Sequence, residues 1–290
     1  MHESIYISLM KKKLFRYFKR SPNFSWKWEH YFKIYENLLN KYINKKIVFV
    51  EVGVADGGSL HMWRSYLGKK ARIIGIDLNP DAKKLEKYGF EIFIGDQSTK
   101  TFWENFYKKV GKIDILLDDG GHKSIQQITS VVESIKHIKN EGMILIEDTC
   151  SSFMNDKAFR THKKYSFINF CNLIVEGIHR RNPLVERKKN LFSNKIHSIC
   201  FYESLTQINI LNKLKDSKHT GNKPKNPVYY VDFRNKGYLI KTLNIYKKFF
   251  GSLNENTVTF KLLRKIFHRN LFFYLHEKMK LKRYFNLFKK

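Results

Sequence analysis

The sequence predicts an α/β fold in which a doubly wound, mostly parallel sheet carries basic helical extensions at both ends. Short apolar, β-branched runs alternate with helical periodicity five times between residues 47 and 150, as in parallel sheets with crossover helices. The first run ends in a glycine-rich turn, and polar residues follow every run. We therefore expect a basic N-terminal segment with a covering helix (1–46), a core domain (47–215), and a linker with a basic, aromatic-rich extension (216–290).

The individual elements follow from the hydrophobic periods. Apolar residues spaced by three and four predict a covering helix over 26–42, whereas residues 1–24 have no clear period. The expected strands of the core are 47–52, 71–78, 90–94, 113–117 and 143–146. The expected helices are 60–67, 80–88, 101–110, 125–138 and 166–179. Two β-rich runs, 196–202 and 207–211, are close enough to form an antiparallel pair, and 216–227 is a turn-rich linker.

The turn after the first strand is suited to a small ligand. Gly53, Gly57 and Gly58 can adopt positive φ and leave room for a ligand against the backbone where a helix begins. The spacing is not that of a dinucleotide fingerprint, because Ala55 stands where the second glycine belongs. NAD is therefore disfavoured, and an ordinary strand-to-helix turn is the alternative.

Charge is distributed unevenly along the chain. The formal net charge is +29, but residues 47–150 carry 14 Lys and Arg against 15 Asp and Glu, so the basic residues lie in the flanking segments. The near-neutral charge of the core argues against a nucleic-acid partner for it. The three cysteines are far apart and form no C-x-x-C pair, which indicates neither a zinc site nor a disulfide framework. With no apolar run of signal-peptide or membrane-span length, we expect a cytoplasmic protein.

Carboxylates follow the predicted strands. Because ligands of an open parallel sheet bind outside the carboxyl ends of its strands, these residues should converge with Gly53 on one edge; they are Asp77, Asp96, Asp118, Asp119, Glu147 and Asp148. Any single one could instead cap a helix. Asp77 suits the hydroxyls of a ribose and Asp96 the amine of an adenine. A ligand with ribose and adenine but no pyrophosphate is S-adenosylmethionine (SAM).

Several motifs carry a resemblance to a known family. The segment 51–59 followed by SLHMW, then GIDL, IGDQ, DDGGH and IEDT, resembles the metal-dependent sugar O-methyltransferases of macrolide biosynthesis, of the mycinamicin and macrocin type, and their cephalosporin-hydroxylase-like relatives. The resemblance covers about residues 31–211, and SICFYES is similar to the sixth strand of that family. It implies a Rossmann-like, seven-stranded, SAM-dependent methyltransferase domain.

The resemblance also implies roles for individual residues. The implied cofactor contacts are Glu51, Gly53, Ser59, Asp77, Asp96, Gln97 and Asp118. The implied Mg²⁺ ligands are Asp119, Glu147 and Asp148, three carboxylates that would repel one another without a cation, and hard oxygen ligands favour Mg²⁺ over zinc. His122 is the implied general base for a sugar hydroxyl chelated by the cation, with a cap of the following helix as the alternative. Gly121 departs from the serine usual in the family.

The leading hypothesis is thus a SAM- and Mg²⁺-dependent O-methyltransferase of a sugar hydroxyl, on a surface polysaccharide precursor or a glycosylated metabolite. A catechol-type or other small-molecule O-methyltransferase is an alternative within the same class. Outside it, the basic tail could bind nucleic acid or an anionic membrane surface. For the tail we favour packing on its own core or on a second subunit. A homo-oligomer and a contact with the inner membrane surface remain open. His30 and Tyr31 could reach the site, although a structural role for the histidine is favoured.

Overall fold

The computed structural model divides into two units, Met1–Thr220 and Gly221–Lys290. It describes residues 13–154, 163–185, 190, 192–212, 214–218 and 220 of the first unit, and residues 278, 281–282 and 284–286 of the second. Those few residues of the second unit are helical, whereas most of the expected linker and tail lies outside the described residues. Within the described ranges, no helix is long and apolar enough to cross a membrane.

The first unit contains a seven-stranded sheet in the order β3-β2-β1-β4-β5-β7-β6. Its strands are β1 Val48–Val52, β2 Arg72–Asp77, β3 Glu91–Ile94, β4 Ile113–Asp118, β5 Ile138–Ile146, β6 Ile196–Tyr202 and β7 Leu205–Ile210. Strands β1 to β5 pair in parallel, and β7 is antiparallel to both β5 and β6. The expected fold class, including the antiparallel pair at the end, is confirmed.

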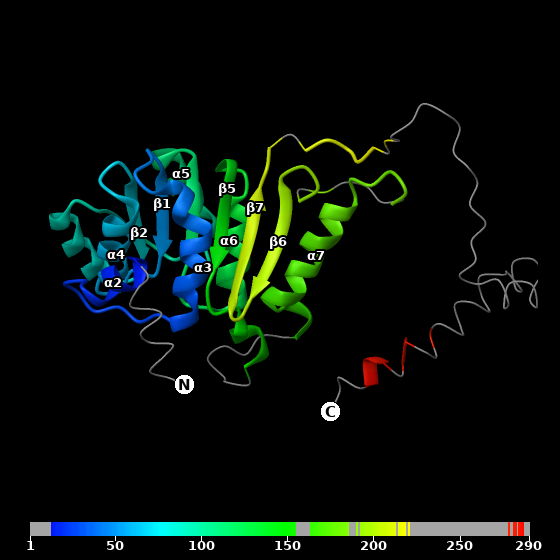
Figure 1. Ribbon diagram of the computed structural model, residues 1–290, viewed down its shortest axis with the longest axis horizontal. Helices are drawn as coiled ribbons and strands as arrows, with labels where there is room; N and C mark the ends of the chain where they lie inside the picture. The colour runs from blue at the N-terminus through cyan, green and yellow to red at the C-terminus, as the bar shows by residue number, and fades with distance from the viewer. Residues whose placement is uncertain are drawn as a thin grey trace, which may run out of the picture. The chain divides into compact units, whose positions relative to one another are not determined.

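Helices cover both faces of this sheet (Figure 1). The α-helices are α2 Lys13–Lys19, α3 Glu29–Leu39, α4 Gly58–Leu67, α5 Lys100–Val110, α6 Ser124–Ser134 and α7 Phe167–His179. Short 3₁₀ segments are η1 Asn40–Tyr42, η2 Pro80–Tyr88, η3 Thr149–Phe153 and η4 Lys163–Tyr165. One apolar core joins α2, α3, α4 and η2 to one face, and a second joins α5, α6 and α7 to the other. Burial on both faces explains why the central strands are almost continuously apolar.

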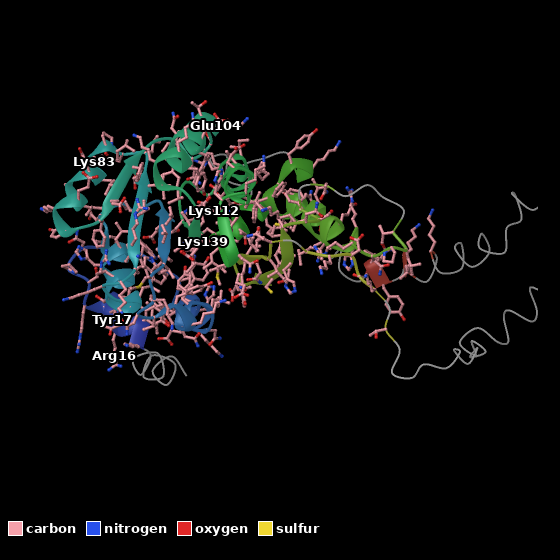
Figure 2. The ribbon with its side chains drawn as sticks, turned by 90° about the horizontal axis from the view of Figure 1, so that it is seen from above. Arg16, Tyr17, Lys83, Glu104, Lys112 and Lys139 are labelled. Carbon is pink, nitrogen blue, oxygen red and sulfur yellow. The ribbon has the colours of Figure 1, made fainter. Side chains whose placement is uncertain are left out.

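Charged side chains lie at the surface of this unit. Figure 2 shows Lys83 and Glu104 at the outer edge of the view, where both are exposed. Exposed charged residues therefore do not mark a ligand site, whereas buried charged residues, such as Lys27, Glu51 and Glu147, do.

The helices differ from the sequence prediction in their boundaries, in one helix type and in one additional helix. The covering helix begins at Glu29 rather than at residue 26. Residues 20–28 before it contain no helix or strand, and we call this segment the strap. The helix expected to reach Ile138 ends at Ser134, because Ile138 pairs with Ile113 and opens strand β5. The segment 80–88 is a 3₁₀ helix. Helix α2 was not predicted, yet Leu14 and Phe15 are buried in the first core.

The strand order reverses between β1 and β4. At such a switch point the loops leaving adjacent strands diverge and open a crevice. Gly53 follows β1 with φ +81°, and a Cβ added there would collide with the backbone carbonyl of Asp119, which follows β4. The crevice thus requires glycine on one side and presents a carboxylate on the other.

Because α2 lies outside any predicted element, its role in stability can be tested directly. Leu14→Ala should lower the free energy of unfolding by about 2–5 kcal/mol, since the side chain is fully buried. Leu78→Ala, the same change at a side chain that is 68% exposed, should have little effect. Chemical denaturation measures both, and equal values would mean that α2 does not belong to the core.

Candidate active site

Two pockets open at the carboxyl edge of the sheet. A pocket of about 680 Å³ is bounded by the glycine loop, the strap and the carboxylates after β4 and β5. A second, of about 410 Å³, lies against the ends of β1, β2 and β3. Gly53, Ala55, Asn79 and Asp119 line both. A ligand in the second pocket therefore lies next to one in the first.

Four of the predicted cofactor residues line the second pocket: Gly53, Asp77, Asp96 and Gln97. The Asp77 carboxylate accepts hydrogen bonds from the backbone N–H groups of Val54 and Ala55, at 3.0 and 2.9 Å. Its Oδ2 therefore holds the glycine loop, while its Oδ1 accepts from the backbone N–H of Asn79 at 2.8 Å and keeps a lone pair for a further donor. Gly53 lines both pockets and Ser59 lines the first.

The other two predicted cofactor residues, Glu51 and Asp118, are buried and line neither pocket. Glu51 accepts hydrogen bonds from Ser59 Oγ at 2.7 Å and from Trp63 Nε1 at 3.2 Å. Asp118 accepts two from the Gln97 amide, both at 2.9 Å. Burial raises the pKa of both carboxyls, in Glu51 against the lowering effect of Lys27. Their visible role is to orient residues that do face the pockets.

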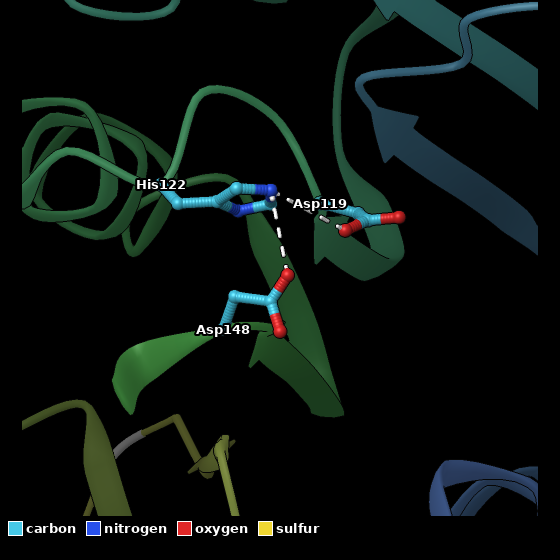
Figure 3. Close-up of side chains that lie close together, drawn as sticks. All are labelled: Asp119, His122 and Asp148. Atoms are coloured by element: carbon cyan, nitrogen blue, oxygen red, sulfur yellow. Dashed lines mark ion pairs between the residues drawn. The ribbon is translucent and has the colours of Figure 1, made fainter. Parts of the chain in front are cut away.

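Asp119, His122 and Asp148 come together in the first pocket (Figure 3). The Nε2 atom of His122 lies 3.4 Å from Asp148 Oδ2 and 4.0 Å from Asp119 Oδ1. The other ring nitrogen, Nδ1, is buried and has no hydrogen-bond partner among the described residues. Lys123, not His122, is the N-cap residue of α6, so the alternative that His122 caps the helix is not supported.

The backbone around these groups adopts an uncommon conformation. Ala55, His122 and Asp148 have φ of 44°, 56° and 51°, in the left-handed region that side chains other than glycine seldom occupy. Residues held in this region tend to cluster at functional sites. The Ser151 hydroxyl donates to the carbonyl of His122 at 2.7 Å, which helps to hold the strained turn.

Glu147 occupies a different position from the other predicted metal ligands. It is 1% exposed, and its Oε1 accepts a hydrogen bond from Lys27 Nζ at 2.7 Å. The same ammonium donates to Asp119 Oδ2 and lies 3.5 Å from Glu51 Oε1. Burial and the nearby Asp119 raise the pKa of Glu147 well above its usual range. Burial alone would lower the pKa of Lys27, but the three carboxylates outweigh it and raise that pKa.

Two further residues fix Asp148 from the N-terminal side. Its Oδ1 atom accepts hydrogen bonds from Trp28 Nε1 and from the Tyr31 hydroxyl, each at 3.0 Å. Tyr31 therefore reaches the site as considered from the sequence, whereas His30 lies near the carbonyl of Glu203. Lys27 and Trp28 were missed, because the periodicity assigned residues 26–42 to a helix whose expected role was to cover the sheet; the SWKWEH run of aromatic and charged residues was the available signal.

The residues present fit a divalent cation. Asp119, His122 and Asp148 each offer one ligand atom, and these atoms lie within 4.8 Å of one another. Two carboxylates with no thiolate suit Mg²⁺ or Mn²⁺. Glu147, expected as a ligand beside Asp119 and Asp148, is placed with Lys27 instead.

Comparison with known proteins identifies the family. The profile of the FtsJ-like methyltransferase family matches residues 30–200, more than half of the chain. The chain belongs to the FtsJ-like methyltransferase family. The matched range includes the glycine loop, the second pocket and all the carboxylates described above, so these features are part of a methyltransferase domain, whereas the strap residues that line the first pocket precede the match.

Characterised relatives of this methyltransferase include sugar O-methyltransferases, and the expected resemblance is confirmed. Over 126 residues the chain is 28% identical to mycinamicin VI 2''-O-methyltransferase of Micromonospora griseorubida, covering 41% of this chain and 31% of that protein. Over 163 residues it is 26% identical to 8-demethyl-8-alpha-L-rhamnosyl tetracenomycin-C 2'-O-methyltransferase of Streptomyces olivaceus, covering 53% and 42%. The chain thus matches less than half the length of these curated relatives.

The fold is also similar to that of a solved enzyme. MycE methyltransferase from the mycinamycin biosynthetic pathway, in complex with Mg and SAH, gives a TM-score of 0.60 at 19% identity. The match covers 80% of this chain and 59% of that one. A complex of MycE with Mg, SAH and mycinamycin VI gives a TM-score of 0.58 at 18% identity. At this identity the likeness establishes the methyltransferase fold.

The crevice between β1 and β4 provides a matched pair of substitutions. Gly53→Ala and Gly89→Ala impose the same backbone strain, because their φ values are +81° and +80°, but nothing lies within 4 Å of a Cβ at Gly89. Gly53→Ala should therefore destabilise the fold more than Gly89→Ala and displace Asp119. Unfolding free energies and near-UV circular dichroism of the two variants test this. Equal losses would show that the crevice tolerates a side chain.

Proposed function

We propose that this chain is a SAM-dependent O-methyltransferase that methylates a sugar hydroxyl with the help of Mg²⁺. The observation that carries the proposal is the meeting of the two pockets at Asp119, with His122 and Asp148 beside the junction. A methyl donor in one pocket and an acceptor in the other would meet at these groups. In-line transfer requires this adjacency.

The second pocket suits the adenosine part of SAM. Asp77 can accept hydrogen bonds from vicinal ribose hydroxyls, and Asp96 from an exocyclic amine. Both line that pocket, together with Gly95 and Gln97. The glycine loop, which Asp77 holds in place, leads from this pocket toward Asp119.

His122 suits the role of general base. A hydroxyl placed between Asp119 and Asp148 would lie beside its Nε2 atom, the ring atom directed at both carboxylates. The imidazole would take the hydroxyl proton, and the oxygen would attack the methyl carbon as the bond to sulfur breaks. Asp148 would stabilise the imidazolium that forms. A divalent cation held by the two carboxylates Asp119 and Asp148 alone would leave His122 Nε2 free to act as the base and would lower the pKa of the hydroxyl.

The wall of the first pocket favours a sugar as the acceptor. Phe24, Trp26 and Trp28 line it and are 69%, 80% and 54% exposed. Large aromatic side chains left in water next to a polar pocket offer flat apolar faces to a ring that has apolar and polar sides. The names of the relatives, all methyltransferases of sugar-bearing compounds, support the same acceptor class.

The setting of the reaction belongs to the same proposal. We place the enzyme in the cytoplasm, acting on a polysaccharide precursor. The 30 Lys and Arg against 8 Asp and Glu in residues 151–290 support a contact of the tail with an anionic membrane surface or a second subunit.

A direct test is incubation of the protein with SAM, Mg²⁺ and panels of nucleotide sugars and glycosides, followed by mass spectrometry. A product heavier by one methylene group and sensitive to chelator supports the proposal. Catechols and RNA belong in the same panel. Methylation of either in place of every sugar would contradict it.

The role of His122 predicts a specific kinetic defect. His122→Ala should lose on the order of 10² to 10⁴ in kcat, the usual contribution of a positioned base. Its SAM affinity by calorimetry should remain that of wild type, because His122 lines only the acceptor-side pocket. His137 precedes β5 at the opposite end of the sheet and stacks on Tyr107, so His137→Ala is the control. A His122→Ala enzyme as fast as wild type would reject this mechanism.

The aromatic wall predicts a different defect. Trp26→Ala should raise KM for the sugar acceptor by about 5- to 100-fold, as expected for loss of one stacking contact. Trp26→Tyr should retain most of the affinity, and SAM binding should not change in either variant. Steady-state kinetics with the acceptor varied separates the two. An unchanged KM in Trp26→Ala would remove Trp26 from the acceptor site.

A further inference from the structure

The strap before helix α3 inserts a cation into the carboxylate cluster. The side chain of Lys27 is 1% exposed, and its Nζ contacts Asp119, Glu147 and Glu51. These carboxylates come from three places, the ends of β4 and β5 and the interior of β1. A buried ammonium with three acidic neighbours is rare, because its desolvation must be offset by close ionic contacts.

Asp119 is shared between this lysine and the group that fits a metal. Its Oδ2 accepts from Lys27, while its Oδ1 faces His122 Nε2 at 4.0 Å. Asp119 also belongs to the group with His122 and Asp148 whose ligand atoms lie within 4.8 Å of one another. A divalent cation on one oxygen of this carboxylate and an ammonium on the other repel each other at short range, with little water between them.

We propose that Lys27 is the resident counter-cation of the cluster and competes with the divalent cation for Asp119. The inference rests on the proposed function, since it concerns the cation of that reaction. In the metal-free enzyme Lys27 contacts Asp119, Glu147 and Glu51 and reduces the repulsion among them. When the metal binds, the ammonium yields Asp119 and keeps Glu147 and Glu51. The cation requirement of the enzyme is thus set by a lysine of the strap.

The strap is built to hold this lysine in place. The Ser21 hydroxyl donates to the carbonyl of Gly58 at 2.8 Å, and the Asn23 amide donates to the carbonyl of Asp56 at 2.5 Å. The backbone N–H of Gly58 donates to the carbonyl of Phe24 at 3.2 Å, and a Cβ at Gly58 would collide with that carbonyl. Trp28 on the other side of Lys27 is bonded to Asp148. The lysine is thus anchored on both sides.

The test is the affinity for Mn²⁺, measured by electron paramagnetic resonance of the free ion. Lys27→Met removes the charge and keeps the length of the side chain, and it should bind Mn²⁺ at least about tenfold more tightly than wild type. Lys84→Met is the matched control, because Lys84 lines the same pocket but is 57% exposed and lies 3.8 Å from Asp56. Its Mn²⁺ affinity should stay near that of wild type.

A second variant keeps the proposal testable if Lys27→Met does not fold. Lys27→Gln lacks the charge but can still donate hydrogen bonds to Asp119 and Glu147, and it should also bind Mn²⁺ more tightly. Both variants should melt at a lower temperature than wild type in chelator and gain more than wild type when Mn²⁺ is added. Unchanged or weaker Mn²⁺ binding in both would overturn the proposal.

Calorimetry with SAM on the same samples distinguishes failure of the proposed methyltransferase function from failure of the competition between Lys27 and the divalent cation. If wild type binds no SAM, the proposed function fails whatever Mn²⁺ does. If SAM binds and the sugar is methylated, but Mn²⁺ binds neither wild type nor the Lys27 variants, the competition is overturned and the methyltransferase stands.

Discussion

The arrangement of the active edge depends on one buried interaction, the ammonium of Lys27 among Glu51, Asp119 and Glu147. Glu51 belongs to β1, Asp119 follows β4 and Glu147 follows β5, so the lysine connects these three strands to the strap. Glu51 extends the connection further, through its hydrogen bonds from Ser59 and Trp63 of helix α4. The glycine loop, the first pocket and the carboxylates of this edge thereby share one electrostatic centre.

Burying four ionisable groups in one place is unfavourable unless their charges compensate one another. Three carboxylates with one ammonium leave an excess of negative charge, and the raised pKa values of Glu51 and Glu147 reflect that excess and their burial. A second positive charge at this edge would relieve it. The electrostatics therefore explain both why a lysine is needed inside the cluster and why a cation outside it is favoured.

The sequence predicts the parts of the site that topology determines. Asp77, Asp96 and Asp119 follow parallel strands, and parallel strands end at one edge, so their convergence needs no knowledge of packing. Lys27 and Trp28 could not be found in this way, because the hydrophobic period extended the covering helix to residue 26, whereas both residues lie in the strap before that helix. Glu147 was assigned as a metal ligand beside Asp148 by the family resemblance, but the two side chains have different surroundings, since Glu147 contacts Lys27 and Asp148 contacts Trp28 and Tyr31. Ile138 fitted a helical period, and only its pairing with Ile113 assigns it to a strand.

The strap also explains how, in the proposed reaction, one short segment can contact the sites of both substrates. On one side its backbone fixes the start of helix α4 through Gly58, next to the loop that faces the cofactor pocket. On the other side its aromatic residues line the acceptor pocket, and Trp28 and Tyr31 set the position of Asp148. Lys27 lies between the part of the strap that contacts the glycine loop and the part that lines the first pocket. A change of charge at Asp119 therefore acts, through Lys27, on both parts. In the proposed reaction, coupling between cation, acceptor and cofactor then requires no motion of the sheet, since the strap and Asp119, which lines both pockets, already connect the three.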